Sequence, residues 1–265
     1  FARLTAHRPT VFAGVPTLYV AMLASPEMPP REQVALRVCA SAGEALPRPV
    51  GEAFRAHFGC DILDGLGSTE MLHIFVSNRA GDVHYGSSGL PVPGYDIDLR
   101  DDDGHPVPLG EIGDLYVRGP SAALLYWANR EKSRATFQGE WLKSGDKYSV
   151  DQGGYLTYAG RSDDMLKVSG QYVSPIEVEA ALSAHPAVLE CAVVGRSDAD
   201  GLTKTAAYIV LAQGREAGDV LADELKAFVK ERLAPHKYPR ELVFLADLPK
   251  TATGKIQRFR LRDAA

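Results

Sequence analysis

Short β-rich runs that alternate with a helical pattern are the feature that most constrains how this chain can fold. The runs lie at residues 11–15, 36–40 and 61–64, and a helical pattern over residues 49–58 separates the last two. Strands that alternate with helices pack in the layers of an α/β fold. The first part of the chain, residues 1–84, is therefore predicted to be an α/β unit.

Two of these runs lead into loops of small and polar residues. The loops read Ser41-Ala42-Gly43-Glu44 and Asp64-Gly65-Leu66-Gly67-Ser68-Thr69-Glu70. Open α/β sheets bind ligands at the carboxyl ends of their strands. Glycines let a phosphate approach the backbone, and hydroxyl and carboxylate groups can hold its magnesium. These loops are the first candidates for a site, and a plain Gly-Ser-Thr turn is the alternative for the second.

The pattern changes between residues 85 and 160. Alternating strands are predicted at residues 95–100 and 114–118, separated by turn residues such as Asp102-Asp103-Gly104. This region is predicted to be a small β-barrel-like subdomain. The acidic run at residues 101–103 is interpreted as a solvated turn.

Residues 161–265 are predicted to form a compact α+β domain. Ser174-Pro175-Ile176-Glu177 supplies an N-cap, a proline at N1 and a capping-box glutamate for a helix. Strands are predicted at residues 191–194 and 206–211. A second helix is expected to begin at about residue 220 and to bury one face, formed by Leu221, Leu225, Phe228, Val229 and Leu233.

Charge and hydropathy exclude several classes of function. A net charge of -5 gives no basic stripe for phosphates, so nucleic acid is not expected as a partner. The longest apolar stretch, residues 11–23, is short and is broken by Gly14 and Pro16, so no membrane segment is predicted.

The cysteines and the first residue bear on location and completeness. Cys39, Cys60 and Cys191 are far apart and have no metal-ligand spacing, which is typical of buried thiols in a reducing cytoplasm. A cytoplasmic protein is expected. Phe1 is neither a start residue nor part of a signal peptide, so the chain is interpreted as a fragment.

Four further positions have a functional and a structural interpretation. Lys255 follows Gly254, but Pro249 and Ile256 exclude a phosphate loop, and a solvated lysine is the alternative. Arg161, with the carboxylates at residues 163 and 164, could bind a ribose or form a hinge, or simply be a surface ion pair. Asp146 could bind a ribose diol or lie in a turn. His73 could line a pocket or be structural.

Six ordered motifs together resemble the adenylate-forming acyl- and aryl-CoA ligases over essentially the whole chain. The motifs are residues 41–44, residues 64–70, the stretch Gly113-Asp114-Leu115-Tyr116-Val117-Arg118-Gly119, Ser144-Gly145-Asp146, residues 160–164, and the lysine motif that ends at Lys255. The resemblance implies that a carboxylate and ATP form an acyl-adenylate and pyrophosphate. The CoA thiol then displaces AMP, with a different domain orientation for each step. ATP, Mg²⁺ and coenzyme A are the implied substrates and cofactor.

The resemblance also implies residue roles. Lys255 would bridge the substrate carboxylate and the α-phosphate as the catalytic residue, and Glu70 would hold magnesium. Asp64 would bind the adenine amino group, Thr69 the phosphate, and Asp146 with Arg161 the ribose. The full set of nucleotide-binding positions is Gly43, Glu44, Ala45, Asp64, Gly65, Leu66, Gly67, Ser68, Thr69, Asp146 and Arg161.

Three further groups of residues follow from the resemblance. Asp163 would be the hinge whose rotation replaces Lys255 with Gly170 beside coenzyme A, and Tyr172 would be a second CoA contact. The acid pocket would be lined by Ala42, Gly65, Gly67, Leu72 and His73. Leu66 stands where the family commonly has an aromatic residue, and Tyr172 where some relatives have a cation.

Residues 68–75 look particularly like the benzoate and 4-hydroxybenzoate CoA ligases of aromatic degradation, so benzoate or a close aryl carboxylate is the expected acid. The family's triphosphate-binding loop is not found in this chain and is expected upstream of Phe1, which makes residues 1–84 part of a larger AMP-binding domain. An adenylation domain that loads a carrier protein, and a truncated nucleotide- or CoA-binding module without turnover, are the alternatives. The oligomeric state is left open, with a homodimer as one alternative.

Overall fold

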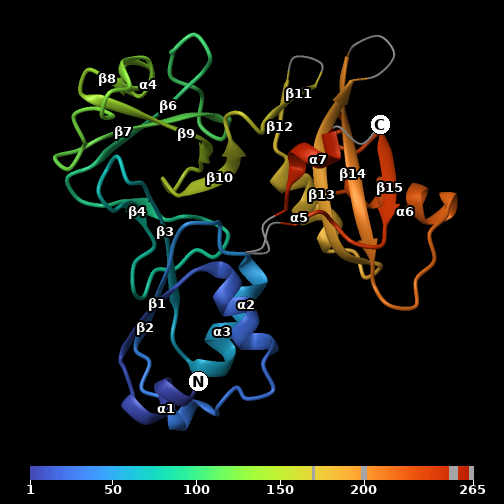
Figure 1. Ribbon diagram of the computed structural model, residues 1–265, viewed down its shortest axis with the longest axis horizontal. Helices are drawn as coiled ribbons and strands as arrows, with labels where there is room; N and C mark the ends of the chain where they lie inside the picture. Colours follow the sequence, from blue (N-terminus) through green and yellow to red (C-terminus); the bar gives the residue numbers. More distant parts are fainter. Residues whose placement is uncertain (169–170, 198–201, 251–255, 263–265) are drawn as a thin grey trace. The chain divides into compact units, whose positions relative to one another are not determined.

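The computed structural model describes residues 1–168, 171–197, 202–250 and 256–262 (Figure 1). The chain divides into two compact units, Phe1–Tyr158 and Ala159–Ala265. The division falls inside strand β10 (Leu156–Arg161). Among the helices described, none is long and apolar enough to cross a membrane.

The first sheet of unit 1 confirms the predicted α/β layering. Its strand order is β1-β2-β3-β4-β5, in which β1, β2 and β3 are parallel and β4 and β5 are added in antiparallel pairing. The strands are β1 (Val11–Gly14), β2 (Val38–Ser41), β3 (Ile62–Gly67), β4 (Ile74–Ser77) and β5 (Leu90–Pro91). The connecting elements are α1 (Ala2–His7), α2 (Pro16–Ala24), the 3-10 helix η1 (Arg31–Gln33) and α3 (Arg48–Phe58). β5 lies beyond the predicted boundary at residue 84.

An aromatic core joins α2 and α3 to this sheet. Tyr19 and Phe54 are fully buried, and their rings meet edge to face with centroids 5.2 Å apart. The Tyr19 hydroxyl donates to the Ala40 carbonyl of β2 at 2.8 Å, so the one polar atom of this ring has a partner. Helix α3 ends at Gly59, whose φ of 69° is the left-handed conformation that glycine adopts without strain. These contacts pack α3 and α2 together beside β2, and the turn at Gly59 then leads the chain from α3 into β3.

The second sheet of unit 1 is the predicted β subdomain. Its order is β10-β9-β7-β6, with β8 paired to β9. The elements are β6 (Asp96–Arg100), β7 (Gly113–Arg118), α4 (Arg130–Thr136), β8 (Phe137–Gln138), β9 (Trp141–Val150) and β10. Leu115, Val117 and Leu142 form the centre of its core. The acidic carboxylate of Asp114 is buried in ion pairs with Lys147 at 3.2 Å and Lys143 at 2.9 Å, which offsets its desolvation.

Unit 2 is the predicted α+β domain, with a sheet covered on both faces. Its elements are the hairpin β11 (Leu166–Val168) and β12 (Gln171–Val173), α5 (Pro175–Ser183), β13 (Val188–Ser197), β14 (Thr203–Leu211), α6 (Asp219–Lys230), β15 (Glu241–Leu245) and α7 (Arg258–Arg262). The three-stranded sheet is ordered β13-β14-β15. Val193 and Ile209 face α5 and α6, whereas Val194 and Tyr208 face Leu261 of α7.

The N-cap and the buried helix face predicted for unit 2 are confirmed, whereas the Glu177 carboxylate, predicted to complete a capping box, accepts from the Lys237 amine at 2.6 and 2.8 Å instead. The Ser174 hydroxyl accepts a hydrogen bond from the Glu177 N–H at 3.2 Å, as an N-cap requires. In α6, Leu225 and Val229 are fully buried, and Leu221 and Leu233 pack against the same core. Phe228 instead meets His185, with ring centroids 4.8 Å apart.

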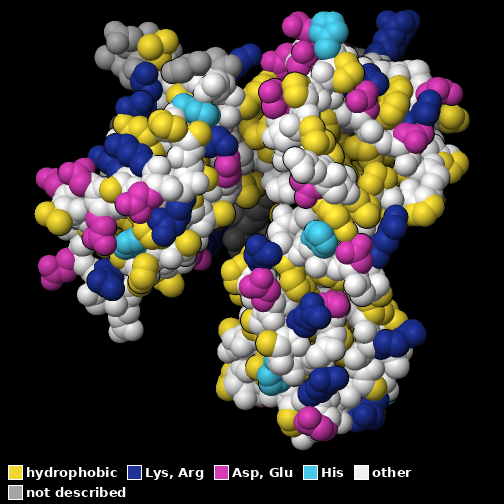
Figure 2. Space-filling view, turned by 180° about the vertical axis from the view of Figure 1, so that it is seen from behind, with side chains coloured by type: hydrophobic (Ala, Val, Ile, Leu, Met, Phe, Trp, Pro, Cys, Tyr) yellow, Lys and Arg dark blue, Asp and Glu magenta, His cyan; other side chains and the backbone are white. Residues whose placement is uncertain are grey.

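Acidic and basic side chains are interspersed over the face that Figure 2 shows, without a large region of one sign. All three cysteines are buried, as predicted. Cys39 and Cys60 lie next to each other, with their sulfur atoms 3.9 Å apart.

Gly89 generates a prediction about stability. Its φ is +99°, and a Cβ atom there would lie 2.1 Å from the Ser77 carbonyl carbon, whereas at Gly104, with a φ of +86°, a Cβ would meet nothing within 4 Å. Gly104→Ala should lower the free energy of unfolding by about 1 kcal/mol through backbone strain alone. Gly89→Ala should lower it by at least about 2 kcal/mol more, because backbone must also move. Urea unfolding of the two variants measures the difference, and equal losses would contradict the close packing at Gly89.

Candidate functional site

Two buried polar side chains lie opposite each other, one at the end of β2 and the other within β3. Ser41 pairs with Asp64 in the parallel register, and they are 1% and 6% exposed. Asp64 Oδ2 accepts a hydrogen bond from the Leu46 N–H at 3.4 Å. Within the described part of the chain, Ser41 Oγ and Asp64 Oδ1 have no hydrogen-bond partner. A buried acceptor without a donor costs free energy, so this pair is a candidate contact for a ligand that carries N–H groups.

The carboxyl group of Asp64 has an altered pKa. Burial raises it to about 6 from 3.8, against the lowering effect of the backbone N–H groups of Leu46 and Gly65. The charged form is penalised because its desolvation is only partly offset by hydrogen bonds. Asp64 therefore changes charge close to neutral pH.

Residues 42–45 lie in the connection from β2 to α3. Ala42 is half-buried, and Gly43, Glu44 and Ala45 are exposed. Gly43 has a φ of +94°, which turns the chain away from the sheet at this point. These residues present backbone groups beside the buried pair and can be reached from solvent.

The prediction that residues 64–70 form one loop is wrong for its first half, because β3 continues to Gly67. Gly65 pairs with Ser77 and Gly67 with Ile74 of β4. A Cβ at Gly65 would lie 2.8 Å from the Val76 oxygen, and one at Gly67 would lie 2.7 Å from the His73 oxygen. The absence of side chains at Gly65 and Gly67 thus allows β4 to lie this close to β3. Leu66 packs against the core of the β subdomain.

The loop itself is the turn from Ser68 to His73. The Ser68 hydroxyl accepts from the Met71 N–H at 3.2 Å, and the Leu72 N–H donates to the Thr69 carbonyl at 3.1 Å. Thr69 is exposed. Leu72 has a φ of +72° and is 75% exposed, a strained and unburied position for a leucine. Strain of this kind clusters at functional sites, which favours a role for this turn in binding.

Glu70 has a fixed carboxylate. Its Oε1 accepts a hydrogen bond from the Tyr126 hydroxyl at 2.5 Å, and its carbonyl accepts from the Ala123 N–H at 2.7 Å. Burial alone would raise the pKa of Glu70. The hydrogen bonds from Tyr126 and Ser68, together with the charge of Lys132, outweigh burial and lower it. Glu70 is thus a carboxylate with a hard anionic oxygen, as magnesium prefers.

His73 lies beside a second tyrosine. Its Nδ1 is 2.6 Å from the Ile74 carbonyl, and its Nε2 is 3.4 Å from the Tyr95 hydroxyl. The Tyr95 hydroxyl is also 2.7 Å from Ser121 Oγ, which donates to the Met71 carbonyl at 2.7 Å. The His73 imidazole therefore has a defined orientation and is exposed.

Asp146 lies in β9, not in a simple turn. The register with β7 shifts between Asp114 and Tyr116, and Gly145 has a φ of +80°. The Asp146 N–H donates to the Ser144 hydroxyl at 3.1 Å. The Gly-Asp pair thus makes a bulge in a strand, which re-aims the aspartate side chain.

The remaining predicted positions lie in unit 2. Arg161 Nε is 3.7 Å from Asp163 Oδ1, and both side chains are exposed, so the pair contributes little to stability. Tyr172 lies in β12, with the Lys167 amine 5.5 Å from its ring centroid. Gly170 and Lys255 lie outside the described residues.

The sequence did not predict that Tyr126, Lys132, Tyr95 and Ser121 lie beside the candidate site residues. Ser41 lies in one of the two loops that were predicted, but no role was predicted for its side chain. Tyr126 is 56 residues from Glu70. No spacing rule along the sequence connects residues so far apart. They meet because the turn between β3 and β4 is hydrogen-bonded to the segment between β7 and α4.

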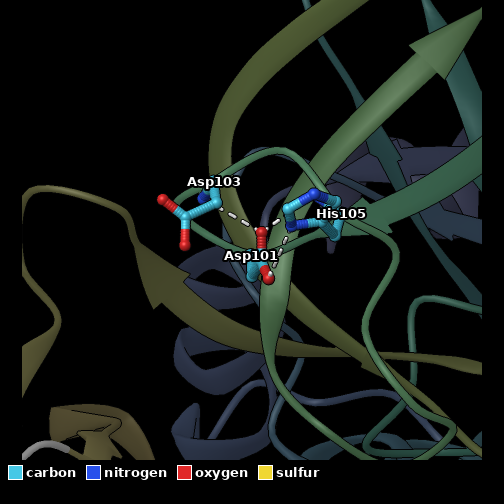
Figure 3. Close-up of side chains that lie close together, drawn as sticks. All are labelled: Asp101, Asp103 and His105. Atoms are coloured by element: carbon cyan, nitrogen blue, oxygen red, sulfur yellow. Dashed lines mark hydrogen bonds and ion pairs between the residues drawn. The ribbon is translucent and has the colours of Figure 1, made fainter.

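The two carboxylates of Asp101 and Asp103 and the imidazole of His105 lie close together at the turn between β6 and β7 (Figure 3). Asp101 Oδ1 accepts hydrogen bonds from the backbone N–H groups of Asp103 at 3.0 Å and His105 at 2.8 Å. The carboxylate thus closes the turn, and the predicted solvated turn explains the cluster.

Comparisons with known proteins find that the chain is similar to AMP-binding enzymes. A family model described as "AMP-binding enzyme" matches residues 1–127, and one described as "AMP-binding enzyme C-terminal domain" matches residues 177–255. The chain is 63% identical to a benzoate–CoA ligase of Thauera aromatica over all 265 residues, which are 50% of that protein. It spans about half the length of the curated relatives it matches.

Two solved structures are similar as well. A benzoate CoA ligase of Burkholderia xenovorans has 68% sequence identity and a TM-score of 0.86, over 99% of this chain and 53% of that one. An anthranilate CoA ligase, AuaEII, in complex with anthranoyl-AMP has 51% identity and a TM-score of 0.83, over 98% of this chain and 50% of that one.

The pKa of Asp64 generates a signed prediction about stability. Because the folded pKa of about 6 exceeds 3.8, the group stabilises the fold fully below pH 3.8 and loses that contribution as the pH rises through 6. Asp64→Asn should therefore raise the melting temperature relative to the unmodified protein at pH 8, equivalent to at most about 3 kcal/mol, and little at pH 4. Asp103→Asn, in the exposed turn, is the matched control. A stability difference that does not change with pH would contradict the assignment.

Proposed function

The chain belongs to the AMP-binding enzyme family, and from this membership we propose that it is part of an ATP-dependent ligase that activates benzoate or a close aryl carboxylate. The acid is converted to an acyl-adenylate with release of pyrophosphate and is then transferred to coenzyme A. The single observation that carries the proposal is the high identity to a benzoate–CoA ligase across every residue of the chain. The similar structure with bound anthranoyl-AMP supports an aromatic adenylate.

The buried pair of β2 and β3 is the proposed adenine site. An exocyclic amino group would supply the donor that Asp64 Oδ1 lacks. The exposed residues 43–45 would border the base, Asp146 and Arg161 would bind the ribose, and the turn from Ser68 to Thr69 would contact phosphate. Leu66 would give no ring stacking, because its side chain packs into the core of the β subdomain.

Glu70 fits the role of magnesium ligand. It is half-buried, its pKa is lowered, and hydrogen bonds orient its carboxylate. Magnesium would neutralise part of the negative charge of the nucleotide phosphates. Glu70 would hold the ion in place, and the exposed Thr69 hydroxyl beside it would bind a phosphate oxygen.

The proposed acid pocket combines the half-buried Ala42 with Gly65, Gly67, Leu72 and His73. The edge of the His73 imidazole and the ring of Tyr95 meet with centroids 6.0 Å apart, which gives the pocket an aromatic wall suited to a flat ring. Gly65 and Gly67 would contribute backbone surface, because β4 fills the space that side chains would take there.

The C-terminal unit would serve both half-reactions. Lys255 would stabilise charge between the carboxylate and the α-phosphate during adenylation, and Gly170 with Tyr172 would border coenzyme A during thioester formation. Asp163, exposed in the turn after β10, would be the hinge between the two states. A cytoplasmic enzyme is proposed, and a homodimer is the alternative to a monomer.

A product assay tests the function. The complete protein is incubated with ATP, Mg²⁺, CoA and a mixture of benzoate, 4-hydroxybenzoate, 2-aminobenzoate and hexanoate, and acyl-CoA products are identified by mass spectrometry. Benzoyl-CoA is expected as the main product. Hexanoyl-CoA as the main product would contradict the aryl assignment, and nucleotide binding without any product would favour a binding module.

A lysine pair tests the catalytic assignment. Lys255→Ala should lower the rate of adenylation by about 100-fold or more, because developing charge loses its counter-charge. Thioester formation from supplied benzoyl-adenylate should be largely kept. Lys250→Ala is the control, since Lys250 is engaged with Glu190 at 2.6 Å and Asp247 at 3.3 Å. Equal loss of both half-reactions in Lys255→Ala would count against the role.

A further inference from the structure

The segment from Ser121 to Tyr126 holds the Glu70 turn at three points. The Ser121 hydroxyl donates to the Met71 carbonyl at 2.7 Å, the Ala123 N–H donates to the Glu70 carbonyl at 2.7 Å, and the Tyr126 hydroxyl donates to Glu70 Oε1 at 2.5 Å. Two of these bonds fix the backbone of the turn. The third fixes the direction of the carboxylate.

Tyr126 is itself held from its other side by α4 and β8. The Tyr126 N–H donates to the Ser133 hydroxyl at 2.9 Å, and the Lys132 amine lies 4.2 Å from the ring centroid. The ring meets Phe137 with centroids 5.4 Å apart. Asn129 caps α4 by accepting from the Lys132 N–H at 3.1 Å, so the lysine is placed by a helix that begins four residues after the tyrosine.

The residues on either side of Tyr126 do not share this burial. Leu125 is 56% exposed and Trp127 is 93% exposed, whereas Tyr126 is half-buried. The tyrosine therefore turns inward from an exposed stretch, and its hydroxyl is directed at one acceptor oxygen. A phenylalanine would satisfy the packing against Phe137 equally well, so packing alone does not explain the hydroxyl.

We infer that Tyr126 is a positioning residue that orients the magnesium-binding carboxylate of Glu70, an inference that rests on the proposed function. A carboxylate with one oxygen fixed by a donor presents its remaining lone pairs in a defined direction. Groups that orient a ligand in this way typically change metal affinity about 10- to 100-fold when they are removed. Tyr126 acts through Glu70 and need not touch substrate.

Metal binding tests the inference without relying on turnover. The complete protein, saturated with α,β-methylene ATP, is titrated with Mn²⁺ as a paramagnetic substitute for Mg²⁺, and free Mn²⁺ is measured by electron paramagnetic resonance. Tyr126→Phe should raise the Mn²⁺ dissociation constant by about tenfold or more. Tyr155→Phe is the matched control, because the Tyr155 hydroxyl also donates to a carboxylate, that of Asp82, at 2.7 Å. It should bind Mn²⁺ as the unmodified protein does.

The half-reactions give a second readout that loss of structure alone would not reproduce. Tyr126→Phe should slow adenylation and raise the Mg²⁺ concentration needed for half-maximal rate, with thioester formation from supplied benzoyl-adenylate kept. Ser133→Ala releases the backbone of Tyr126 without altering its ring, and should shift the Mn²⁺ dissociation constant in the same direction by a smaller factor.

The outcomes separate this inference from the proposed function. Unchanged Mn²⁺ affinity in Tyr126→Phe, or in Glu70→Gln, overturns the inference even if benzoyl-CoA is formed. Weakened Mn²⁺ binding in Tyr126→Phe supports it even if the unmodified protein makes no aroyl-CoA, a result that would reject the proposed function alone. Equal slowing of both half-reactions with unchanged Mn²⁺ affinity shows a structural role and also overturns it.

Discussion

β4 lies very close to β3. A Cβ atom at Gly65 would be 2.8 Å from the Val76 oxygen, and one at Gly67 would be 2.7 Å from the His73 oxygen. This approach joins an antiparallel strand to the parallel part of the sheet. It also requires the chain to reverse between Gly67 and Ile74, which produces the tight turn that carries Thr69 and Glu70. Asp64 in β3 and the accessible turn that follows β3 are thus only a few residues apart, and the turn forms there because Gly65 and Gly67 have no side chains to keep β4 away.

The two carboxylates of the candidate site, Asp64 and Glu70, have pKa values shifted in opposite directions. Asp64 lies among apolar and backbone groups, and burial raises its pKa to about 6. Glu70 is also partly desolvated, but hydrogen bonds from neighbouring hydroxyls and a nearby lysine lower its pKa. The buried carboxylate therefore takes up a proton at a higher pH than the outer one. Such a division suits a site that binds a base in its interior and a phosphate-bound cation at its rim.

The sheet of unit 2 is closely packed. Both faces of its sheet are covered, by α5 and α6 on one side and α7 on the other. Glu179 of α5 forms a bidentate pair with Arg258 of α7, at 2.7 and 2.9 Å, and Glu179 also accepts from the Val193 N–H at 2.8 Å. Asp163, proposed as the hinge, lies instead in the turn after β10, and Tyr172, proposed as a CoA contact, lies in β12, both outside this three-stranded sheet.

The sequence by itself determined the local elements and the chemical types of the site. Three features depend on residues that are near each other in the sequence, so local patterns predict them. They are the N-cap of α5, the buried face of α6 and the alternation of strands and helices. The sequence motif at residues 64–70 also predicts Asp64 and Glu70 as site residues. Only the tertiary structure decided that β3 continues through Gly67, that Asp146 lies in a bulge of β9, and that Tyr126 binds Glu70. These features depend on contacts between segments far apart in the chain, whose pairing is fixed by packing and backbone hydrogen bonding rather than by local residue preference.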